Sequence, residues 1–376
     1  MSNCAVSAVS AGTHQETLTV DAVLERLLTT QIEDIEEDDE MVTACINRIF
    51  SLSRPVKVET VRQRKVNLNR YRRQVEKLKL IPHVEQRTPA WHLMRKSLIT
   101  ASDFAQALGE GKFGTQKQFF QKKCGYEKDV FNYNSPPLKW GTMYEQVAGD
   151  IYCRRNNVTM HEFGILRHPT ISHIGASPDG ITSNGIMVEI KCPYKRKITG
   201  EIPAQYYYQI QGQLDVCELN ECDYLECEFT ELTDMDVFKA FDKEKGVIIE
   251  YSTDGSTAPD YVYSPTWSGA GTDMALIDDW INSNIDDTKN NIVLHYWTLT
   301  LINVVRVYKN EEFIKEKMAM LADVWAKVLE YQADEALYKR EIGGANPTRG
   351  NSMTVDLGTK GGKQMAPKLS GYAFIE

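Results

Sequence analysis

The chain has 376 residues, of which 42% are hydrophobic, 43 are Lys or Arg and 52 are Asp or Glu, and its formal net charge is −9. These values are typical of a globular protein with one large domain or two modest ones, and they exclude collagen-like and wholly disordered classes. No apolar run approaches the ~18 residues that cross a bilayer, and residues 1–16 lack the basic start and apolar core of a secretory signal. Eight cysteines are too sparse for a disulfide scaffold. We therefore expect an intracellular protein of the cytoplasm or nucleus that is not secreted and has no membrane partner.

Charges are divided unevenly between two neighbouring segments near the start of the chain. Residues 1–50 contain ten acidic and two basic residues, including the acidic run 36–40, whereas residues 54–79 contain ten basic and two acidic residues. The negative net charge of the whole chain is therefore a weak argument against nucleic acid as a partner. The basic segment fits a phosphate-binding arm, an intramolecular partner of the acidic segment or a solvated helix face, and the sequence leaves these three open.

The chain divides into three predicted regions. Apolar residues with helical spacing between Val20 and Ser51 predict two short amphipathic helices, which with the basic segment form a mainly helical N-terminal extension over 1–80. A compact domain is expected over 81–342. Gly, Asn, Pro, Ser and Lys dominate 343–376, which predicts a flexible C-terminal tail.

Helices and strands are mixed within the compact region. Thr88 followed by Pro89 is typical of a helix N-cap and first helical position, and it predicts a helix over 91–98. The further predicted elements, in chain order, are a helix from Ser102, a helix over 144–155, strands over 173–184 and 185–192 joined by a turn at 183–185, a helix over 203–219, a strand over 224–230, a long loop over 252–275, a strand over 292–307 and a long helix over 311–339. Because the strands and helices do not alternate regularly, we expect an α/β fold with a central mixed sheet flanked by helices, carrying an insertion near 231–290.

The residues most informative about chemistry are Asp179, Glu189 and Lys191. Asp179 ends one predicted strand, and Glu189 and Lys191 lie two apart on the next, so both point to the same face while Ile190 points to the other. Two carboxylates that converge at a hairpin can hold Mg²⁺, and a lysine on that face can orient water or stabilise charge on a phosphate. Metal, carboxylates and ammonium together are suited to phosphodiester hydrolysis.

Each half of this pattern, the segment around Asp179 and the Glu189–Lys191 pair, also has a purely structural explanation. Ser-Pro-Asp-Gly, which ends at Gly180, is a common turn sequence, and Glu-x-Lys on a strand is often an ion pair. Their combination at a spacing of ten residues, with apolar Val188 and Ile190 on the other face, favours the metal site.

Taken together, four ordered motifs resemble the PD-(D/E)xK nuclease core, in the form found in lambda-exonuclease and YqaJ-type viral recombinases. The resemblance covers about residues 91–229 and is absent from 1–80. The matching segments are Trp91-His-Leu-Met-Arg95 with Ile99-Thr-Ala-Ser102, Trp140-Gly-Thr-Met-Tyr-Glu145, Ser177-Pro-Asp-Gly180 with Glu189-Ile-Lys-Cys-Pro193, and Tyr206-x-x-Gln209-x-Gln211.

The resemblance implies a role for each matching polar residue. Asp179, Glu189 and the backbone carbonyl of Ile190 would coordinate Mg²⁺ or Mn²⁺, with two ions in the site. Glu145 would bind a metal-bound water or the second ion, and Lys191 would position the attacking water. The implied substrate-binding residues, which would hold a terminal 5′-phosphate or the adjacent backbone, are Arg95, Ser102, Ser177, Gln209 and Gln211.

One position departs from the family pattern. Where lambda exonuclease itself carries a further acidic residue ten positions before the Ser-Pro-Asp aspartate, this chain has Pro169, next to His168. How the second metal is held is therefore open, while the reaction class is not affected.

The resemblance implies a metal-dependent exonuclease that degrades linear duplex DNA with free ends from 5′ to 3′ in recombination, repair or viral genome processing. A single-strand annealing protein and a homo-oligomer such as a toroidal trimer are the implied partners. Two alternatives are a structure-specific endonuclease on the same core and an inactive DNA-binding or assembly protein. Intact Asp179, Glu189 and Lys191 weigh against the second.

Two further patterns are interpreted as structural. The spacing of Cys217, Cys222 and Cys227 is unlike a zinc ribbon, so buried thiols are expected. In the run 206–208 of three tyrosines, the rings could stack on bases, but on an amphipathic helix at least one should face the core.

Overall fold

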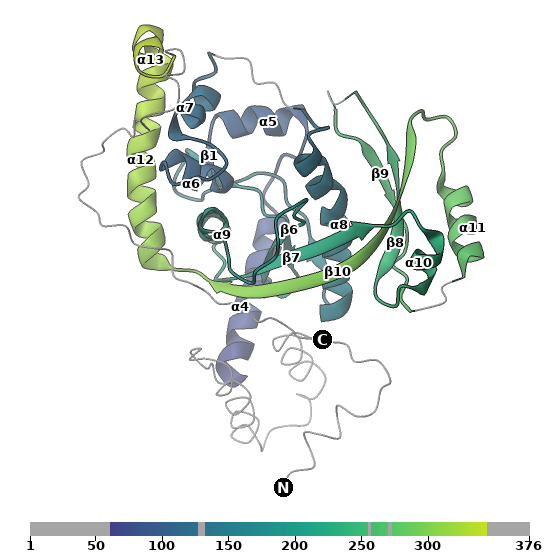
Figure 1. Ribbon diagram of the computed structural model, residues 1–376. Helices are drawn as coiled ribbons and strands as arrows, with labels where there is room; N and C mark the ends of the chain where they lie inside the picture. Colours follow the sequence, from purple (N-terminus) through teal and green to yellow (C-terminus); the bar gives the residue numbers. More distant parts are fainter. Residues whose placement is uncertain (1–60, 127–131, 255–256, 270–272, 344–376) are drawn as a thin grey trace.

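The computed structural model describes residues 61–126, 132–254, 257–269 and 273–343 (Figure 1). The two helices predicted between Val20 and Ser51, the acidic run and the tail from residue 344 lie outside the described residues. In the part of the chain that the structure describes, none of the helices combines the length and apolar character that a bilayer crossing requires.

Two sheets organise the described residues. The larger one has seven strands in the order β2-β5-β6-β7-β10-β8-β9, and the smaller one has the order β1-β4-β3. β6 pairs parallel to β7, and every other neighbouring pair of the larger sheet is antiparallel. In chain order the strands are β1 (Ile99–Thr100), β2 (Met160–His161), β3 (Leu166–Arg167), β4 (Ile174–Ala176), β5 (Gly180–Thr182), β6 (Met187–Lys191), β7 (Glu221–Glu231), β8 (Lys245–Tyr251), β9 (Asp260–Tyr263) and β10 (Ile292–Tyr308). The predicted mixed sheet is confirmed.

Helices flank the larger sheet, as predicted (Figure 1). In chain order they are α4 (Val61–Lys79), α5 (Pro89–Lys96), the 3₁₀ turn η1 (Ala101–Asp103), α6 (Phe104–Ala107), α7 (Gln116–Cys124), α8 (Pro136–Asn156), α9 (Ala204–Val216), α10 (Met235–Ala240), α11 (Met274–Asn284), α12 (Glu311–Ala333) and α13 (Glu335–Glu341). The predicted N-cap of α5 is confirmed, because the Thr88 hydroxyl accepts a hydrogen bond from the backbone N–H of Trp91.

The two faces of β6 pack against different helices. Met187 belongs to a buried cluster that contains residues of α9, whereas Val188 and Ile190 belong to a cluster that contains residues of α8. Since successive side chains of a strand point to opposite faces, Glu189 and Lys191 share the α9 side. Ile190 is buried on the α8 side, as the sequence predicted.

The predicted strand over 173–184 is wrong in part, because the structure divides it into β4 and β5, which belong to different sheets. Pro178 lies between them and has no N–H to donate to a ladder. The turn at 183–185 is confirmed. Gly185 has φ +79°, and a Cβ there would lie 2.4 Å from the Cβ of Tyr71 in α4, so both the backbone and the close packing require glycine.

Two predictions in the second half also need correction. The segment 252–275 is not all loop, because β9 forms within it and pairs with β8. Its consecutive Tyr261, Val262 and Tyr263 are good strand formers. The long helix expected over 311–339 is interrupted at Asp334, whose side chain accepts a hydrogen bond from the Leu337 N–H and caps α13.

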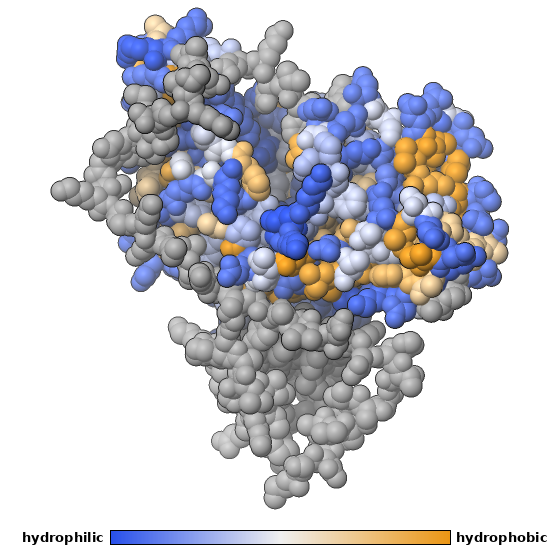
Figure 2. All heavy atoms as spheres, in the orientation of Figure 1, coloured by the Kyte–Doolittle hydropathy of each residue, from blue (hydrophilic) through white to orange (hydrophobic). Residues whose placement is uncertain are grey.

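The residues of the predicted insertion extend the larger sheet beyond β10. Phe238, Val247 and Ile277 form a buried cluster there that is separate from the two clusters on either side of β6. Figure 2 shows apolar side chains gathered on this side of the molecule, to the right of the view. Exposed large apolar residues of this part include Val237, Leu276 and Val293. The domain boundaries themselves stay predictions.

The described part of the basic segment is the helix α4. Its buried residues follow helical spacing along one side, and they are Leu68, Tyr71, Val75 and Leu78. The helix thus packs against the body by an apolar stripe, and its basic residues lie mostly on the exposed side.

Candidate active site

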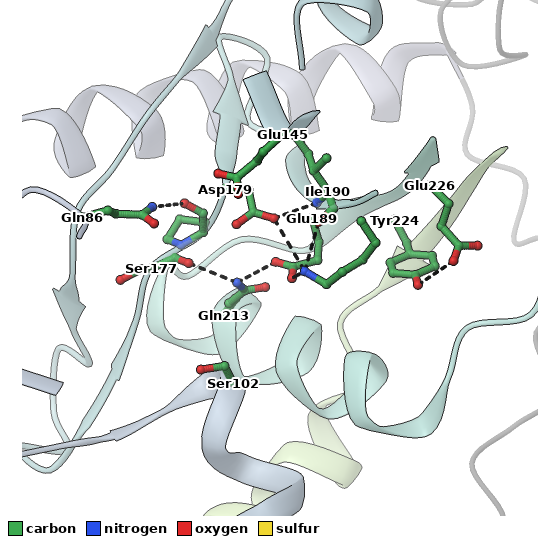
Figure 3. A network of polar contacts seen from close by, with 12 residues as sticks. Gln86, Ser102, Glu145, Ser177, Asp179, Glu189, Ile190, Gln213, Tyr224 and Glu226 are labelled. Atoms are coloured by element: carbon green, nitrogen blue, oxygen red, sulfur yellow. Dashed lines mark hydrogen bonds and ion pairs between the residues drawn. The ribbon is translucent and has the colours of Figure 1, made fainter. Parts of the chain in front are cut away.

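The residues Asp179, Glu189 and Lys191 meet on the α9 side of the β5–β6 hairpin. Figure 3 shows Asp179 and Glu189 close together there. The Lys191 ammonium contacts Glu189 Oε1, lies 3.0 Å from the Ile190 carbonyl oxygen and lies 3.8 Å from Asp179 Oδ2. The side chain of Glu189 is fully buried, while Asp179 and Lys191 are 14% and 20% exposed. Three oxygens from the sequence-predicted metal ligands therefore surround one cation at the edge of solvent.

Asp179 is held by β6, the second strand of the hairpin. Its Oδ2 accepts a hydrogen bond of 2.8 Å from the backbone N–H of Ile190. The backbone of Ile190 therefore contacts both side chains, because its N–H donates to Asp179 and its carbonyl oxygen accepts from the Lys191 ammonium. The chain bends at Asp179, between the end of β4 and the start of β5, where the strand predicted over 173–184 is broken.

Glu145 reaches the same region from α8 (Figure 3). Its Oε2 accepts a hydrogen bond of 2.8 Å from Nη2 of Arg87, a residue that sequence reasoning missed. Arg87 lies in the connection before α5 and has φ +66°, a left-handed conformation that is uncommon for a residue with a side chain. No local motif points to Arg87, because the pairing joins residues 58 positions apart.

The carboxylates crowd negative charge into a largely buried site. Burial, and then the charge of Asp179, raise the pKa of Glu145 and that of Glu189 to about 7. Burial on its own would lower the pKa of Lys191, but the charges of Glu189 and Asp179 outweigh it and raise that pKa. The site therefore holds its lysine charged and has a strong affinity for positive charge.

Gln213 of α9 is a second residue that sequence reasoning missed. Its Nε2 donates to Glu189 Oε2 over 2.8 Å and lies 3.4 Å from the carbonyl oxygen of Ser177 (Figure 3). Its Oε1 is buried and has no hydrogen-bond partner among the described residues. Helical periodicity could have found Gln213, because it lies four residues after Gln209 and seven after Tyr206 on one face of α9. The Tyr206 ring lies 5.2 Å from the Lys191 ammonium.

The residues expected to bind phosphate form a second cluster. Arg95 Nη2 donates to the Ser102 hydroxyl over 3.0 Å, and its guanidinium lies 4.5 Å from the centre of the Trp91 ring. The Trp91 indole N–H donates to the Ser177 hydroxyl over 3.1 Å. Trp91 thus links Arg95 to Ser177, and Arg95 in turn contacts Ser102. Gln209 is half-buried on the face of α9 that carries Gln213.

Gln211 is placed differently from the other sequence-predicted residues, and the structure does not bring it to the carboxylates. Its side chain is buried, its Nε2 donates to the Tyr308 carbonyl over 2.9 Å, and its Oε1 accepts from the Asn310 N–H over 2.7 Å. Residues 209 and 211 differ by two positions, which places them on different sides of a helix. Gln211 therefore ties α9 to the end of β10.

The donor types fit a hard divalent cation. Asp179, Glu189 and the Ile190 carbonyl present oxygens, the ligands that Mg²⁺ and Mn²⁺ take in proteins. Within the described ranges, no group of three or more His, Cys, Asp or Glu side chains is arranged as a metal cage. The lysine occupies the centre of the oxygens instead, and the buried Oε1 of Gln213 adds an oxygen without a partner.

The residues interpreted as structural have structural surroundings. Cys217, Cys222 and Cys227 are buried free thiols, as predicted. Of the three tyrosines, Tyr207 and Tyr208 are buried, which confirms that the run faces the core in part. His168, beside Pro169, lies 3.1 Å from Asp215 Oδ2.

A comparison with known families identifies the part of the chain that carries this geometry. Residues 90–220 match the model of the YqaJ-like viral recombinase domain. This segment of the chain is therefore similar to a YqaJ-like viral recombinase domain. The match includes α5, α8, the β5–β6 hairpin and α9, which together present the residues described above.

The chain is also similar to curated viral proteins. The uncharacterized protein R354 of Acanthamoeba polyphaga mimivirus is 29% identical over 303 residues, which cover 68% of this chain and 54% of that protein. A protein of African swine fever virus (isolate Tick/South Africa/Pretoriuskop Pr4/1996) is 30% identical over 162 residues, which cover 35% of this chain and 46% of that protein. The chain spans about half the length of these curated relatives.

Solved structures with a similar course of the chain include two exonucleases. An alkaline exonuclease from Laribacter hongkongensis is 18% identical and matches with a TM-score of 0.41, covering 67% of this chain and 97% of that one. A phage-related exonuclease from Haemophilus somnus 129PT is 12% identical and matches with a TM-score of 0.35, covering 66% of this chain and 99% of that one.

Proposed function

We propose that the protein is a divalent-metal-dependent deoxyribonuclease that degrades linear duplex DNA from a 5′ end. The observation that carries this proposal is the convergence of Asp179 and Glu189 on the Lys191 ammonium, in a segment similar to a YqaJ-like viral recombinase domain. Largely buried carboxylates with raised pKa values beside a charged lysine at the edge of solvent are typical of catalytic sites and favour a catalytic role.

Asp179, Glu189 and the Ile190 carbonyl would hold the metal, with Glu145 contributing through a water or toward a second ion. Bound Mg²⁺ or Mn²⁺ would supply Lewis-acid stabilisation of the phosphate and a more acidic water. Lys191 keeps its proton and can orient the attacking water or stabilise negative charge that develops on the phosphate. Gln213 donates a hydrogen bond to Oε2 of Glu189, which leaves Oε1 of that carboxylate directed toward Lys191 and the proposed metal.

A continuous set of contacts links the carboxylates to the phosphate-binding cluster, and it favours an exonuclease over an endonuclease. Gln213 bridges Glu189 and the Ser177 carbonyl, and the Ser177 hydroxyl accepts from Trp91, on which Arg95 stacks. We propose that Arg95, Ser102, Ser177 and Gln209 bind the terminal 5′-phosphate while the first diester lies beside Lys191. An endonuclease would have no need of an end-binding group next to its metal ligands.

The wider role follows from the products. Removal of one strand from a 5′ end exposes a 3′ strand that recombination, repair or viral genome processing can use. A single-strand annealing protein and a homo-oligomer that encloses the duplex are the proposed partners, and both rest on the family resemblance.

The test is digestion of linear duplexes labelled at either end, carrying a 5′-phosphate or a 5′-hydroxyl, with Mg²⁺, with Mn²⁺ or with chelator. We expect metal-dependent release of mononucleotides from the 5′-phosphorylated strand and resistance of a closed circle. Cleavage of a nicked circle into long fragments would instead support the endonuclease. Binding without any cleavage in either metal would support the inactive DNA-binding protein.

A further inference from the structure

A lysine with no exposed surface lies directly behind the proposed phosphate-binding cluster. Lys123 of α7 is fully buried, and its Nζ donates to the Leu98 carbonyl, the Arg95 carbonyl and Asp103 Oδ2 over 2.6, 2.7 and 2.8 Å. An ammonium has three N–H groups, so every donor of Lys123 is used. One of its three acceptors is the carbonyl of Arg95 itself, in the last turn of α5, and another is the carbonyl of Leu98, two residues after that helix.

Asp103 connects the same lysine to the turn that carries Ser102. Its Oδ2 accepts from Lys123 and from the backbone N–H and hydroxyl of Thr100, the latter two over 3.2 and 2.7 Å. The Thr100 hydroxyl in turn lies 3.2 Å from that of Ser102. The Lys123–Asp103 pair therefore fixes α5 and η1 relative to each other, and with them the side chains of Arg95 and Ser102.

The charge around Asp103 is unbalanced in favour of an anion. Lys122 Nζ lies 3.0 Å from its Oδ1, so Arg95, Lys122 and Lys123 surround a single carboxylate. Burial would raise the pKa of that carboxyl, but the three cations outweigh burial and hold the pKa well below its usual value. The group carries a net charge of about +2, which matches the charge of a terminal phosphate monoester rather than the single charge of a diester.

A buried ion pair is a poor way to stabilise a fold. Desolvation of the two charges cancels most of their attraction, and apolar residues of similar volume are often as stable or more so. The cost is explained if the pair has a task that an apolar contact cannot perform, namely to bind two backbone segments in one geometry.

We propose that Lys123 and Asp103 are positioning residues for recognition of the 5′-phosphate: they hold Arg95 and Ser102 at the separation that grips a terminal phosphate dianion, and Lys122 supplies the third positive charge. This inference rests on the proposed function, since it concerns the same end-binding site.

The experiment measures binding and cleavage separately. Short duplexes with a 5′-phosphate or a 5′-hydroxyl are titrated into the full chain by fluorescence anisotropy in chelator, and cleavage of both is followed in Mg²⁺. The variants are Lys123→Met, Lys122→Gln and the double variant Asp103→Asn with Lys123→Met, which leaves no unpaired buried charge if the single one fails to fold. Lys112→Gln removes the same charge from an exposed lysine in the loop before α7.

We expect wild-type protein and Lys112→Gln to bind the phosphorylated duplex more tightly than the hydroxyl one. The ratio should fall about tenfold or more in Lys123→Met and in the double variant, and about three- to tenfold in Lys122→Gln. Cleavage of 5′-phosphorylated ends should fall by a larger factor than cleavage of 5′-hydroxyl ends in these three variants, whereas Lys112→Gln should cleave both kinds of end as wild type does. A merely structural pair would lower binding and cleavage of both duplexes together and leave the ratio unchanged, and that result would overturn the inference.

Arg95→Ala separates the two levels of the proposal. If Arg95→Ala abolishes the phosphate preference and the Lys123 and double variants keep it, the positioning role is wrong and the end-binding site stands. If wild-type protein shows no preference in binding or in cleavage, the end-binding site itself is wrong, and the inference is overturned with it.

Discussion

Arg87 donates a hydrogen bond of 2.8 Å to Glu145 from a backbone with φ +66°. The pair joins the loop before α5 to the helix α8 and gives a half-buried carboxylate its cation. This backbone conformation costs a residue with a side chain about 1–2 kcal/mol relative to glycine. Arg87 therefore adopts a strained backbone in the same structure in which its side chain pairs with Glu145.

Replacement of Arg87 should separate catalysis from stability. Arg87→Ala and Arg87→Gly both remove the partner of Glu145, and we expect cleavage to fall by about ten- to a hundredfold in each. Arg87→Gly should nevertheless be more stable than Arg87→Ala, by about 1 kcal/mol in the free energy of unfolding, because glycine relieves the strained backbone. Urea unfolding and single-turnover cleavage measure the two effects. Equal stability of the two variants would show that the strain is absent.

The central ion pair should be essential for activity and replaceable for folding. We expect Glu189→Gln to reduce cleavage by about 10³-fold or more, with a free energy of unfolding close to that of wild type, because the amide keeps the shape and removes a buried charge. Lys191→Met should be inactive and less stable by about 3–5 kcal/mol, since Glu189 then remains buried without its cation. The double variant should regain stability without activity. Urea unfolding and metal-dependent digestion distinguish these outcomes.

Two glutamines on α9 should differ in their effect on kcat. Gln213→Leu removes the hydrogen bond to the buried Glu189, and we expect about a tenfold or greater loss of kcat together with a loss of about 1–3 kcal/mol in stability. Gln211→Leu leaves the Tyr308 carbonyl and the Asn310 N–H without their partner, which should cost about 1–3 kcal/mol of stability and leave kcat near wild type. If Gln211→Leu loses kcat at a temperature where the variant is folded, Gln211 takes part in substrate binding, as the sequence analysis predicted.

Stability should fall in alkaline solution through His295. Its two ring nitrogens lie 2.9 Å from Glu231 Oε1 and 2.9 Å from Glu250 Oε2, and although burial lowers its pKa, the two carboxylates outweigh burial and raise the pKa to about 9. Because this pKa lies above the unfolded value of about 6.5, protonated His295 stabilises the folded protein fully below pH ~6.5. This contribution to the free energy of unfolding is lost as pH rises through ~9.

His295→Gln is the matching variant. Between pH 6 and pH 9.5, the free energy of unfolding of wild type should fall by about 1–3 kcal/mol more than that of the variant. Urea titrations of both proteins at each pH measure the difference, and the comparison removes contributions from other groups. Parallel curves for the two proteins would mean that His295 is neutral in the native state.

The sequence predicted the local parts of the fold and site, because local signals determine them. Thr88 and Pro89 mark the start of α5, the turn ending at Gly185 marks the β5–β6 hairpin, and Glu-x-Lys places two side chains on one face of a strand. The break at Pro178 was missed because the strand before it and the strand after it are short. The extension of the sheet by β9 was missed because polar residues surround it.

The long-range part of the site could not be derived from local patterns. Arg87 meets Glu145 across 58 positions, and Lys123 meets Asp103 across 20. These contacts depend on how helices and loops pack against one another, and no local pattern of residues in the sequence predicts them. Gln213 is intermediate, since helical periodicity applied to α9 would have chosen Gln213 in place of Gln211.

The packing of α4 has a practical consequence for truncation. A chain shortened to begin at residue 81, at the predicted edge of the compact domain, would lose Leu68, Tyr71, Val75 and Leu78 from the surface of the body. The groove they leave would include the hairpin turn at Gly185, whose strand leads to Glu189. Shortened proteins intended for crystals or assays should therefore keep the helix from Val61 onward, because an uncovered apolar groove next to the hairpin invites aggregation.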